Sequence, residues 1–220
     1  MQEIFRLFFG KDPSVLDAVE AASSRLQFGA GAVILGEEDS GTSVYYILSG
    51  KAKTVRYSSE GSEIWLDEIG PGTLIGEMTA LGARARTATI VADSDVIVAA
   101  FPEQSFLALM ANHGSIGVKV AKLLVARVEQ TTQRMFELAA YSSKGRVYAE
   151  LLRQAKPVQN SPYSRIEKMP SMSVIARRLN NTRETVSRTV NELEKAGFIE
   201  RRGNQLTILL PDELREMPTS

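Results

Sequence analysis

The sequence predicts an α+β protein in three parts: an N-terminal β-roll that is jelly-roll-like in its many short strands, a long helix, and a C-terminal winged helix-turn-helix domain. Three observations predict this class. Short β-rich runs fill residues 27–101, an unbroken helical stretch covers about 115–140, and two helices flank a tight turn within 171–196. We expect the boundaries to be 1–114 for the roll, 115–140 for the helix, 141–143 for a hinge and 144–220 for the last domain.

The composition is that of an ordinary soluble chain, with 44% hydrophobic and 24% charged residues among 220. We expect a cytoplasmic protein that does not meet the membrane. No apolar run approaches the length of a bilayer span, and the Phe-rich start at residues 4–9 is too short for a signal peptide. The absence of cysteine excludes disulfides and thiolate-held clusters, and the single histidine, His113, excludes multi-histidine metal sites and histidine-based catalytic triads. We therefore expect neither a bound metal nor an enzyme.

The charges are unevenly distributed along the chain. Residues 1–140 contain 12 basic and 17 acidic side chains, a net charge of 12 − 17 = −5. Residues 141–220 contain 14 basic and 9 acidic side chains, a net charge of 14 − 9 = +5. This asymmetry indicates that only the C-terminal part meets a polyanion.

The N-terminal part is predicted to begin with a helix over residues 12–26, which has helical patterning and an early Pro13. Six β-rich runs follow, separated by turn residues that include 58–61 and 70–72. Many short strands at this spacing favour a compact antiparallel barrel or roll over alternating strand–helix units. Trp65 and the Tyr45–Tyr46 pair are expected in its core or wall, and the runs are 32–35, 44–48, 51–57, 64–69, 87–91 and 96–101.

One segment of the roll, residues 74–88, carries side chains suited to ligand chemistry. A glycine at 76 followed by a short helical turn offers unpaired backbone N–H groups to an anion. Arg86 can bind a phosphate through its planar fork and Thr87 adds a hydroxyl, whereas Glu77 suits a sugar hydroxyl rather than a phosphate. The spacing fits equally well a surface turn with an ordinary Glu77–Arg86 ion pair, and the residues alone leave both interpretations open.

The long helix carries an apolar heptad seam, which favours a left-handed pair of helices. At about 1.5 Å per residue it is roughly 40 Å long, more than one small domain needs. Thr131 and Thr132 place two hydroxyls at the seam: either they fix its register, or something polar binds against the helix at this height. The seam comprises Val120, Leu124, Val128, Thr131, Met135 and Leu138, and the predicted solvated flank comprises Lys119, Lys122, Arg127, Glu129, Gln133, Arg134 and Glu137.

The C-terminal part has the pattern of a helix-turn-helix followed by a wing. A helix over 173–179 leads through Asn180–Asn181 to a second helix that Thr182 caps and Gly197 ends. Val186, Val190 and Leu193 should face inward, and residues 198–200 and 206–209 flank a hairpin. Arg183 near the start of the second helix opposes the helix dipole, so an anionic target rationalises it. The pattern predicts a DNA-binding module.

The segment around residue 76 resembles the phosphate-binding cassette of cyclic-nucleotide-binding domains, with eight residues between Glu77 and Arg86. The runs 31–34, 44–50 and 70–72 fit the same domain. The resemblance implies that Arg86 holds a cyclic phosphate, Glu77 takes the ribose 2′-hydroxyl, Gly76 supplies a backbone donor, and Thr87 lies near phosphate and base. The matching residues are Gly76, Glu77, Met78, Arg86, Thr87 and Ala88.

The stretch 182–188 resembles the recognition helix of the catabolite activators in the CRP/FNR family of regulators. The resemblance implies that Arg183 and Arg188 read guanines, Glu184 reads a cytosine and Thr185 contacts a phosphate, on TGTGA-type half-sites of palindromic double-stranded DNA. Guanidinium forks suit guanine O6 and N7, and a carboxylate accepts from cytosine N4. The predicted DNA-contacting residues are Thr182, Arg183, Glu184, Thr185, Ser187 and Arg188.

The family resemblance also implies a homodimer that contacts RNA polymerase. Thr131 and Thr132 fall where this family touches the nucleotide base, one hydroxyl residue from each subunit, so the ligand interpretation of the two threonines is preferred. Catabolite activators commonly have Ser where this chain has Thr87, and they respond to cAMP; the Arg86–Thr87 pair is similar to that of cGMP-selective kinases and channels. We expect cAMP as the effector, with cGMP as the alternative.

Other classes of function explain the sequence less well. A regulator of the same fold could sense a different small molecule, or none. An enzyme subunit or a channel domain would need a catalytic constellation or a membrane span. A purely structural dimerisation protein would leave Arg183, Glu184 and Arg188 unexplained.

Overall fold

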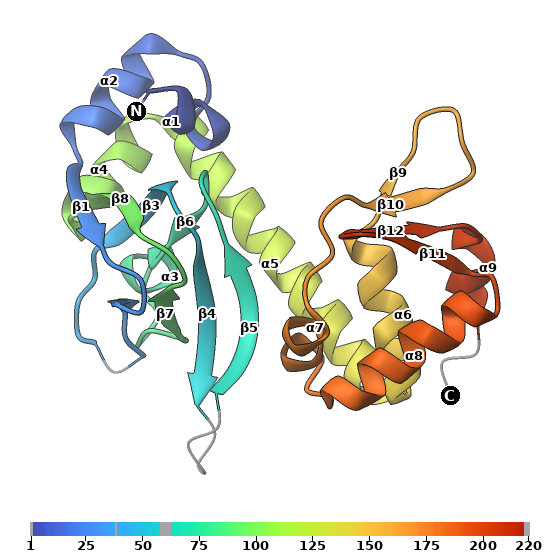
Figure 1. The fold of residues 1–220 in the computed structure, drawn as a ribbon. Helices are drawn as coiled ribbons and strands as arrows, with labels where there is room; N and C mark the ends of the chain where they lie inside the picture. Colours follow the sequence, from blue (N-terminus) through green and yellow to red (C-terminus); the bar gives the residue numbers. More distant parts are fainter. Residues whose placement is uncertain (1, 38, 58–62, 218–220) are drawn as a thin grey trace. The chain divides into compact units, whose positions relative to one another are not determined.

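The computed structural model describes residues 2–37, 39–57 and 63–217 and divides into two compact units, Met1–Arg127 and Val128–Ser220. Figure 1 shows the first unit as a β-rich body with helices at one end and the second as a helical body around a small sheet. The long helix α5, Gly114–Ala140, contributes to both units. The predicted α+β class is confirmed.

The first unit is a roll of two antiparallel four-stranded sheets, with strand orders β1-β8-β3-β6 and β2-β7-β4-β5. Alternation along the strands places one set of side chains between the sheets, where Val96 and Val98 of β8 are buried. The strands are β1 Ser24–Phe28, β2 Val33–Leu35, β3 Val44–Ser49, β4 Ala52–Tyr57, β5 Glu63–Ile69, β6 Leu74–Ile75, β7 Thr89–Ala92 and β8 Val96–Phe101.

Helices cover the outer face of the β1-β8-β3-β6 sheet. Phe5, Tyr46 and Phe101 are among the fully buried side chains there, and the Tyr46 hydroxyl donates to the Ile4 carbonyl at 2.6 Å. Burial raises the pKa of Tyr46 to about 12. The start of α5 packs into the same core, which anchors the long helix to the roll. The other helices of this unit are α1 Gln2–Phe9, α2 Pro13–Ala21, α3 Glu77–Ala80 and α4 Glu103–Asn112.

Several boundaries in the roll differ from the sequence predictions. The helix predicted over 12–26 ends at Ala21, because residues from Ser24 onward pair with β8 as strand β1. The run 87–91 begins later, at Thr89, and the two-residue strand β6 and the helices α1 and α4 were not predicted. The turn predicted at 58–61 lies outside the described residues. Trp65 and Tyr46 are buried as expected.

The N-terminal end of the seam predicted for α5 is wrong. Val120 is 1% exposed and Leu124 packs against the helix-covered core, so this end of the seam faces the roll. The C-terminal end of the predicted seam, from Val128 to Leu138, is exposed, and so is a second heptad line that shares Val128 and Met135 with it. This exposed line is Val118, Ala121, Val125, Val128, Thr132, Met135 and Ala139.

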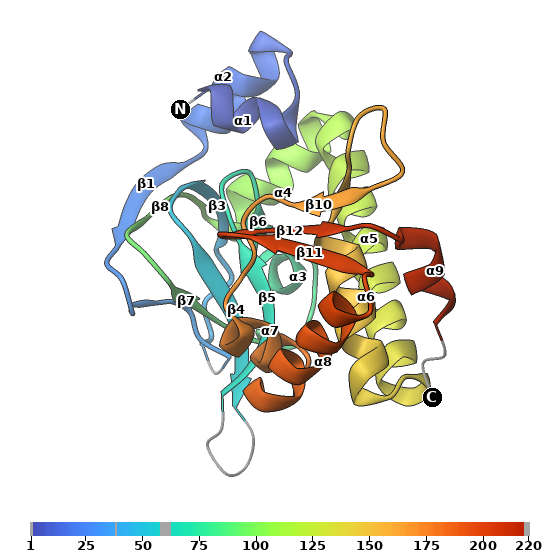
Figure 2. The same cartoon turned by 45° about the vertical axis from the view of Figure 1, so that its right-hand side comes forward.

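The second unit is a helix-turn-helix with a small antiparallel sheet in the order β11-β12-β10-β9, and α6 and α8 pack against this sheet (Figure 2). Thr182 caps α8 by accepting from the Thr185 N–H at 3.1 Å, and Gly197 follows with φ of 79°. Val186, Val190 and Leu193 are buried as predicted. The elements are α6 Ser143–Gln154, β9 Lys156–Pro157, β10 Ser164–Ile166, α7 Met172–Arg178, α8 Arg183–Lys195, β11 Ile199–Arg202, β12 Gln205–Ile208 and α9 Pro211–Glu216.

Candidate ligand site and nucleic-acid interface

The structure brings three of the predicted ligand residues together. Gly76 joins β6 to α3, Glu77 is the first residue of α3, and Arg86 lies in the loop that leads into β7. The Arg86 side chain crosses back to Gly76 and donates from Nη1 to its carbonyl oxygen at 2.8 Å. The loop between α3 and β7 therefore folds onto the start of α3.

Arg86 is a buried cation that is held by backbone carbonyls. Its Nη2 donates to the Ser43 carbonyl at 2.8 Å, its Nε has no hydrogen-bond partner in the described part of the chain, and only 5% of the residue is exposed. Burial lowers the pKa of Arg86, while the neighbouring Tyr45, Asp39 and Glu77 act in the opposite direction. A guanidinium has five N–H donors, so this one is oriented by two bonds and keeps others for an anion.

Gly76 is needed for this arrangement. Its φ of 80° is in the left-handed region, where residues with a Cβ are strained. A Cβ at this position would lie 2.6 Å from Arg86 Nη1 and 2.9 Å from the Ser43 carbonyl oxygen. Any side chain here would push Arg86 out of its place.

Glu77 is fully buried and only half satisfied. Its Oε1 accepts from Arg127 Nη1, whereas its Oε2 has no partner among the described residues. Burial raises the pKa of Glu77, and the charges of Arg127 and Arg86 oppose this rise. A buried acceptor without a donor is costly, which indicates a hydroxyl-bearing ligand as its missing partner.

The remaining predicted ligand residues are more exposed. Thr87 is exposed beside Arg86, Met78 is 39% exposed, and Ala88 is half-buried. Thr131 and Thr132 are exposed on α5. The alternative of a surface turn with a Glu77–Arg86 ion pair is wrong, because both side chains are buried and the ion pair of Glu77 is with Arg127.

The predicted nucleic-acid residues lie along the start of α8. Arg183, Glu184 and Arg188 are exposed, and the Thr182 and Thr185 hydroxyls are 2.8 Å apart. One face of α8 carries a row of polar side chains that extends beyond the predicted residues. It is lined by Arg183, Glu184, Ser187, Arg188, Asn191, Glu192 and Lys195.

Neighbouring elements hold this helix in place. Arg201 of β11 pairs with Glu194 and also donates to Asn191 Oδ1 at 2.8 Å, which ties the hairpin to the C-terminal half of α8. The Glu194 hydrogen bond raises the pKa of Arg201. Lys144 of α6 pairs with Glu192 at 2.6 Å. These contacts leave the N-terminal half of α8 available to a partner.

Comparisons with known proteins agree with this division. A cyclic nucleotide-binding domain model matches residues 25–113, and a Crp-like helix-turn-helix model matches residues 145–217. The cyclic AMP receptor protein of Thermus thermophilus is 30% identical over 196 residues, which cover 88% of this chain and 87% of that protein. The chain belongs to the CRP/FNR family of transcription regulators.

Other CRP/FNR relatives cover nearly the whole chain. The CRP-like cAMP-activated global transcriptional regulator of Mycobacterium tuberculosis is 24% identical over 204 residues, 92% of this chain and 91% of its own. The structure of OCPA-complexed CprK superposes with a TM-score of 0.75 at 18% identity, covering 92% of this chain and 94% of that one, and shows the shared fold. The family consists of regulators rather than enzymes.

In this CRP/FNR chain the residue that sequence reasoning missed is Arg127. It was assigned to the solvated flank of α5, but its Nη2 donates to the Leu74 carbonyl at 2.7 Å and its Nη1 pairs with Glu77. The sequence feature that could have indicated a ligand-side role for Arg127 is its position one helical turn before Thr131. Arg127 thus links the long helix to the start of α3.

Two further findings concern the described part of this regulator. Across residues 2–37, 39–57 and 63–217, no helix is long and apolar enough to cross a membrane. Within the same ranges, no group of three or more His, Asp or Glu side chains is placed to hold a metal ion.

Proposed function

We propose that this CRP/FNR regulator is a homodimer whose binding of a cyclic nucleotide controls its binding of palindromic DNA. The observation that carries the proposal is the incomplete pair of buried charges in the roll. Arg86 has no carboxylate bonded to it, and Glu77 Oε2 has no donor among the described residues. A phosphate and a sugar hydroxyl on one small molecule would complete both.

The assignment of roles follows from the chemistry of each side chain. The free donors of Arg86 bind the cyclic phosphate, and Glu77 Oε2 accepts from the ribose 2′-hydroxyl. Gly76 keeps the backbone close enough for Arg86 to reach this position, and Met78, Thr87 and Ala88 border the ligand. Thr131 and Thr132 contact the base, with one of the two supplied by each subunit.

The preferred nucleotide is cAMP. Two relatives that cover most of the chain carry cyclic AMP in their names, the Thermus receptor protein and the Mycobacterium regulator. Threonine hydroxyls both donate and accept, so Thr131 and Thr132 can serve adenine N6 or guanine O6. For this reason cGMP is the alternative, with Thr87 as the residue that would favour it.

The dimer is proposed to form along the exposed heptad line of α5. Val118, Val125, Val128 and Met135 are each more than half exposed, and their spacing is that of a two-helix seam. An apolar line of this kind is stabilised by burial against an identical line on a second copy. The revised line includes Thr132, so the seam itself places a hydroxyl near the proposed nucleotide base.

The proposed DNA contacts are those of α8. Arg183 and Arg188 read guanines, Glu184 reads a cytosine, and the Thr185 hydroxyl contacts a phosphate, with the helix inserted N-terminus first into the major groove. A two-fold dimer then reads TGTGA-type half-sites about one helical turn, roughly 34 Å, apart. A nucleotide that favours the DNA-competent state by about 1.4 kcal/mol activates binding tenfold. Recruitment of RNA polymerase is part of the proposal.

The test is DNA affinity measured on a palindromic TGTGA site at fixed salt, because phosphate contacts make affinity depend steeply on salt. cAMP and cGMP are titrated separately, and a scrambled palindrome is the control. The proposal predicts that cAMP tightens binding to the palindrome at least about tenfold more than to the scrambled site. A stronger effect of cGMP would reassign the base preference to Thr87. Binding to the palindrome that neither nucleotide changes would refute the nucleotide switch.

A further inference from the structure

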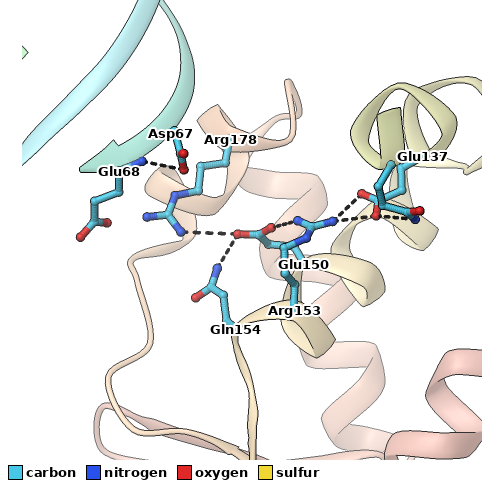
Figure 3. Close-up of polar contacts among 8 residues, drawn as sticks. Asp67, Glu68, Glu137, Glu150, Arg153, Gln154 and Arg178 are labelled. Atoms are coloured by element: carbon cyan, nitrogen blue, oxygen red, sulfur yellow. Dashed lines mark hydrogen bonds and ion pairs between the residues drawn. The ribbon is translucent and has the colours of Figure 1, made fainter. Parts of the chain in front are cut away.

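Two buried glutamates and two less buried arginines of the second unit form a cluster of ion pairs (Figure 3). Arg153 lies at the centre. Its Nη2 donates to Glu137 Oε1 at 2.7 Å and Oε2 at 2.5 Å, and its Nη1 pairs with Glu150. Glu150 also accepts from Arg178 at 3.4 Å and from Gln154 at 2.5 Å. We call Glu137, Glu150, Arg153 and Arg178 the hinge cluster.

The hinge cluster joins three helices, α5, α6 and α7, across a break in helical structure between α5 and α6. Glu137 is in the last turn of α5, Glu150 and Arg153 are in the second half of α6, and Arg178 ends α7. Between α5 and α6 the helical backbone is interrupted at Tyr141–Ser142, and this interruption is the break. The side chains therefore connect the end of the long helix to the second half of α6 and to α7, the first helix of the helix-turn-helix, in addition to the covalent connection.

The break itself is also held by hydrogen bonds. The Ser142 hydroxyl caps α6 by accepting from the Gly145 N–H at 3.2 Å, and Arg146 donates to the Tyr141 carbonyl at 3.0 Å. Asn181, in the turn before α8, donates to the Ser143 carbonyl at 3.2 Å. The end of α5, the start of α6 and the turn of the helix-turn-helix are thus bonded to one another.

Arg153 bonds to carboxylates on both sides of the break. The side chains of Glu137 and Glu150 are 8% and 6% exposed, so each carboxylate needs a charged partner. Burial lowers the pKa of Arg153, but its bonds to Glu137 and Glu150 outweigh this and raise it overall. A planar fork can serve two carboxylates in different directions, whereas the single ammonium of a lysine cannot reproduce both contacts.

We propose that Arg153 is a positioning residue for DNA recognition, which fixes the angle between the end of α5 and the helix-turn-helix. This inference rests on the proposed dimeric DNA binding. If each α8 is held at a fixed angle to its α5, a change in how the two α5 helices pair is passed to the DNA-reading helices. Arg153 itself touches neither ligand nor DNA. Its effect appears in the spacing of the two half-sites that the dimer accepts.

Half-site spacing is a sensitive measure of this angle. One added base pair moves a half-site by about 3.4 Å and turns it by roughly 35° around the duplex, since one turn takes about 10.5 base pairs. A dimer whose two helix-turn-helix domains are held rigidly on α5 cannot bind both displaced half-sites without distortion. A dimer whose helix-turn-helix domains pivot at Tyr141–Ser142 can bind both.

The experiment uses the full-length protein with saturating cAMP and three palindromes: the preferred spacing, one base pair shorter and one base pair longer. The variants are Arg153→Lys, which keeps the charge but loses the fork, and Glu137→Gln, an isostere that frees the α5 side alone. Arg215→Gln is the matched control, because Arg215 is an exposed arginine of the same unit that pairs locally with Asp212. Thermal unfolding verifies that each variant is folded.

We expect wild type and the Arg215→Gln control to prefer the best spacing by about a hundredfold, and both hinge variants to reduce that preference to about tenfold or less. Folded hinge variants with the wild-type spacing profile would overturn the positioning role. So would variants that weaken binding equally at every spacing. If wild type binds none of the palindromes, the proposed function fails first, and this inference with it.

Discussion

Arg86→Ala tests whether the buried guanidinium is a ligand-binding group or a structural one. In the structure Arg86 donates to the Gly76 and Ser43 carbonyls at 2.8 Å each, and none of the described carboxylates is bonded to it. A structural arginine in such a position would contribute to folding through these two bonds. An arginine that binds the phosphate of a ligand would contribute mainly to nucleotide affinity.

The two roles differ in magnitude. Each hydrogen bond to a carbonyl is worth about 1 kcal/mol net, and the cost of burying the cation offsets part of it, so the free energy of unfolding should fall by about 2 kcal/mol or less. A phosphate held by two charge-assisted bonds gains about 1.5–3 kcal/mol from each, or about 3–6 kcal/mol in total. At 1.4 kcal/mol per tenfold change, nucleotide affinity should fall by about 10² to 10⁴.

The assay is calorimetric titration of the folded protein with cAMP, together with thermal unfolding in the absence of nucleotide. Arg84→Ala is the control, because it removes the same charge from an exposed position two residues away. We expect the control to keep wild-type affinity to within a few-fold. An Arg86→Ala protein that is much less stable yet binds cAMP normally would refute the ligand role. An equal loss of cAMP affinity in Arg86→Ala and Arg84→Ala would show that only the overall charge of the protein matters.

Three further predictions concern Glu77, the exposed line of α5 and the DNA-reading helix α8. Burial raises the pKa of Glu77, so its contribution to stability is greatest below the ordinary glutamate pKa and is lost as pH rises through the raised value. Glu77→Gln should remove that loss in thermal unfolding and weaken cAMP binding about 10- to 100-fold; unchanged affinity would remove the ribose role. Val125→Glu places a charge on the exposed α5 line and should convert the dimer to monomer in sedimentation, whereas a persistent dimer would place the interface elsewhere. Arg188→Ala should cost about 1–3 kcal/mol on the preferred DNA site and relax base preference there, while the Arg215→Ala control, which removes an exposed arginine outside α8, should lose little; a loss that is uniform across sequences would make Arg188 a phosphate contact.

Much of the fold could be predicted because its signals are local. Turn residues delimit most strands of the roll, and Thr182 and Gly197 delimit α8 as caps. Strand β1 was missed because Leu26 continues an apolar helical pattern, and only pairing with β8 makes this segment extended. Tertiary contact there outweighs local propensity.

The ligand site was predictable in its parts but not in its connections. The spacing from Gly76 to Arg86 is visible in the sequence, and so are the candidate hydroxyls. The bond between Glu77 and Arg127 joins residues 50 apart, and no local pattern indicates it. Which face of α5 is exposed depends in the same way on the core of the roll, where Val120 is buried. The roles assigned to the ligand and DNA residues stay predictions.

The buried glutamates of the roll and of the hinge cluster differ in whether their carboxylates are fully paired. In the hinge cluster the carboxylates of Glu137 and Glu150 both have guanidinium partners. Around α3, Glu77 Oε2 and Arg86 Nε are both buried and without partners among the described residues. A buried carboxylate oxygen without a donor costs free energy, and a hydroxyl of a bound ligand would supply the donor that Glu77 Oε2 lacks. This difference supports the proposal that a ligand binds beside Glu77 and Arg86, and that the hinge cluster positions the helix-turn-helix.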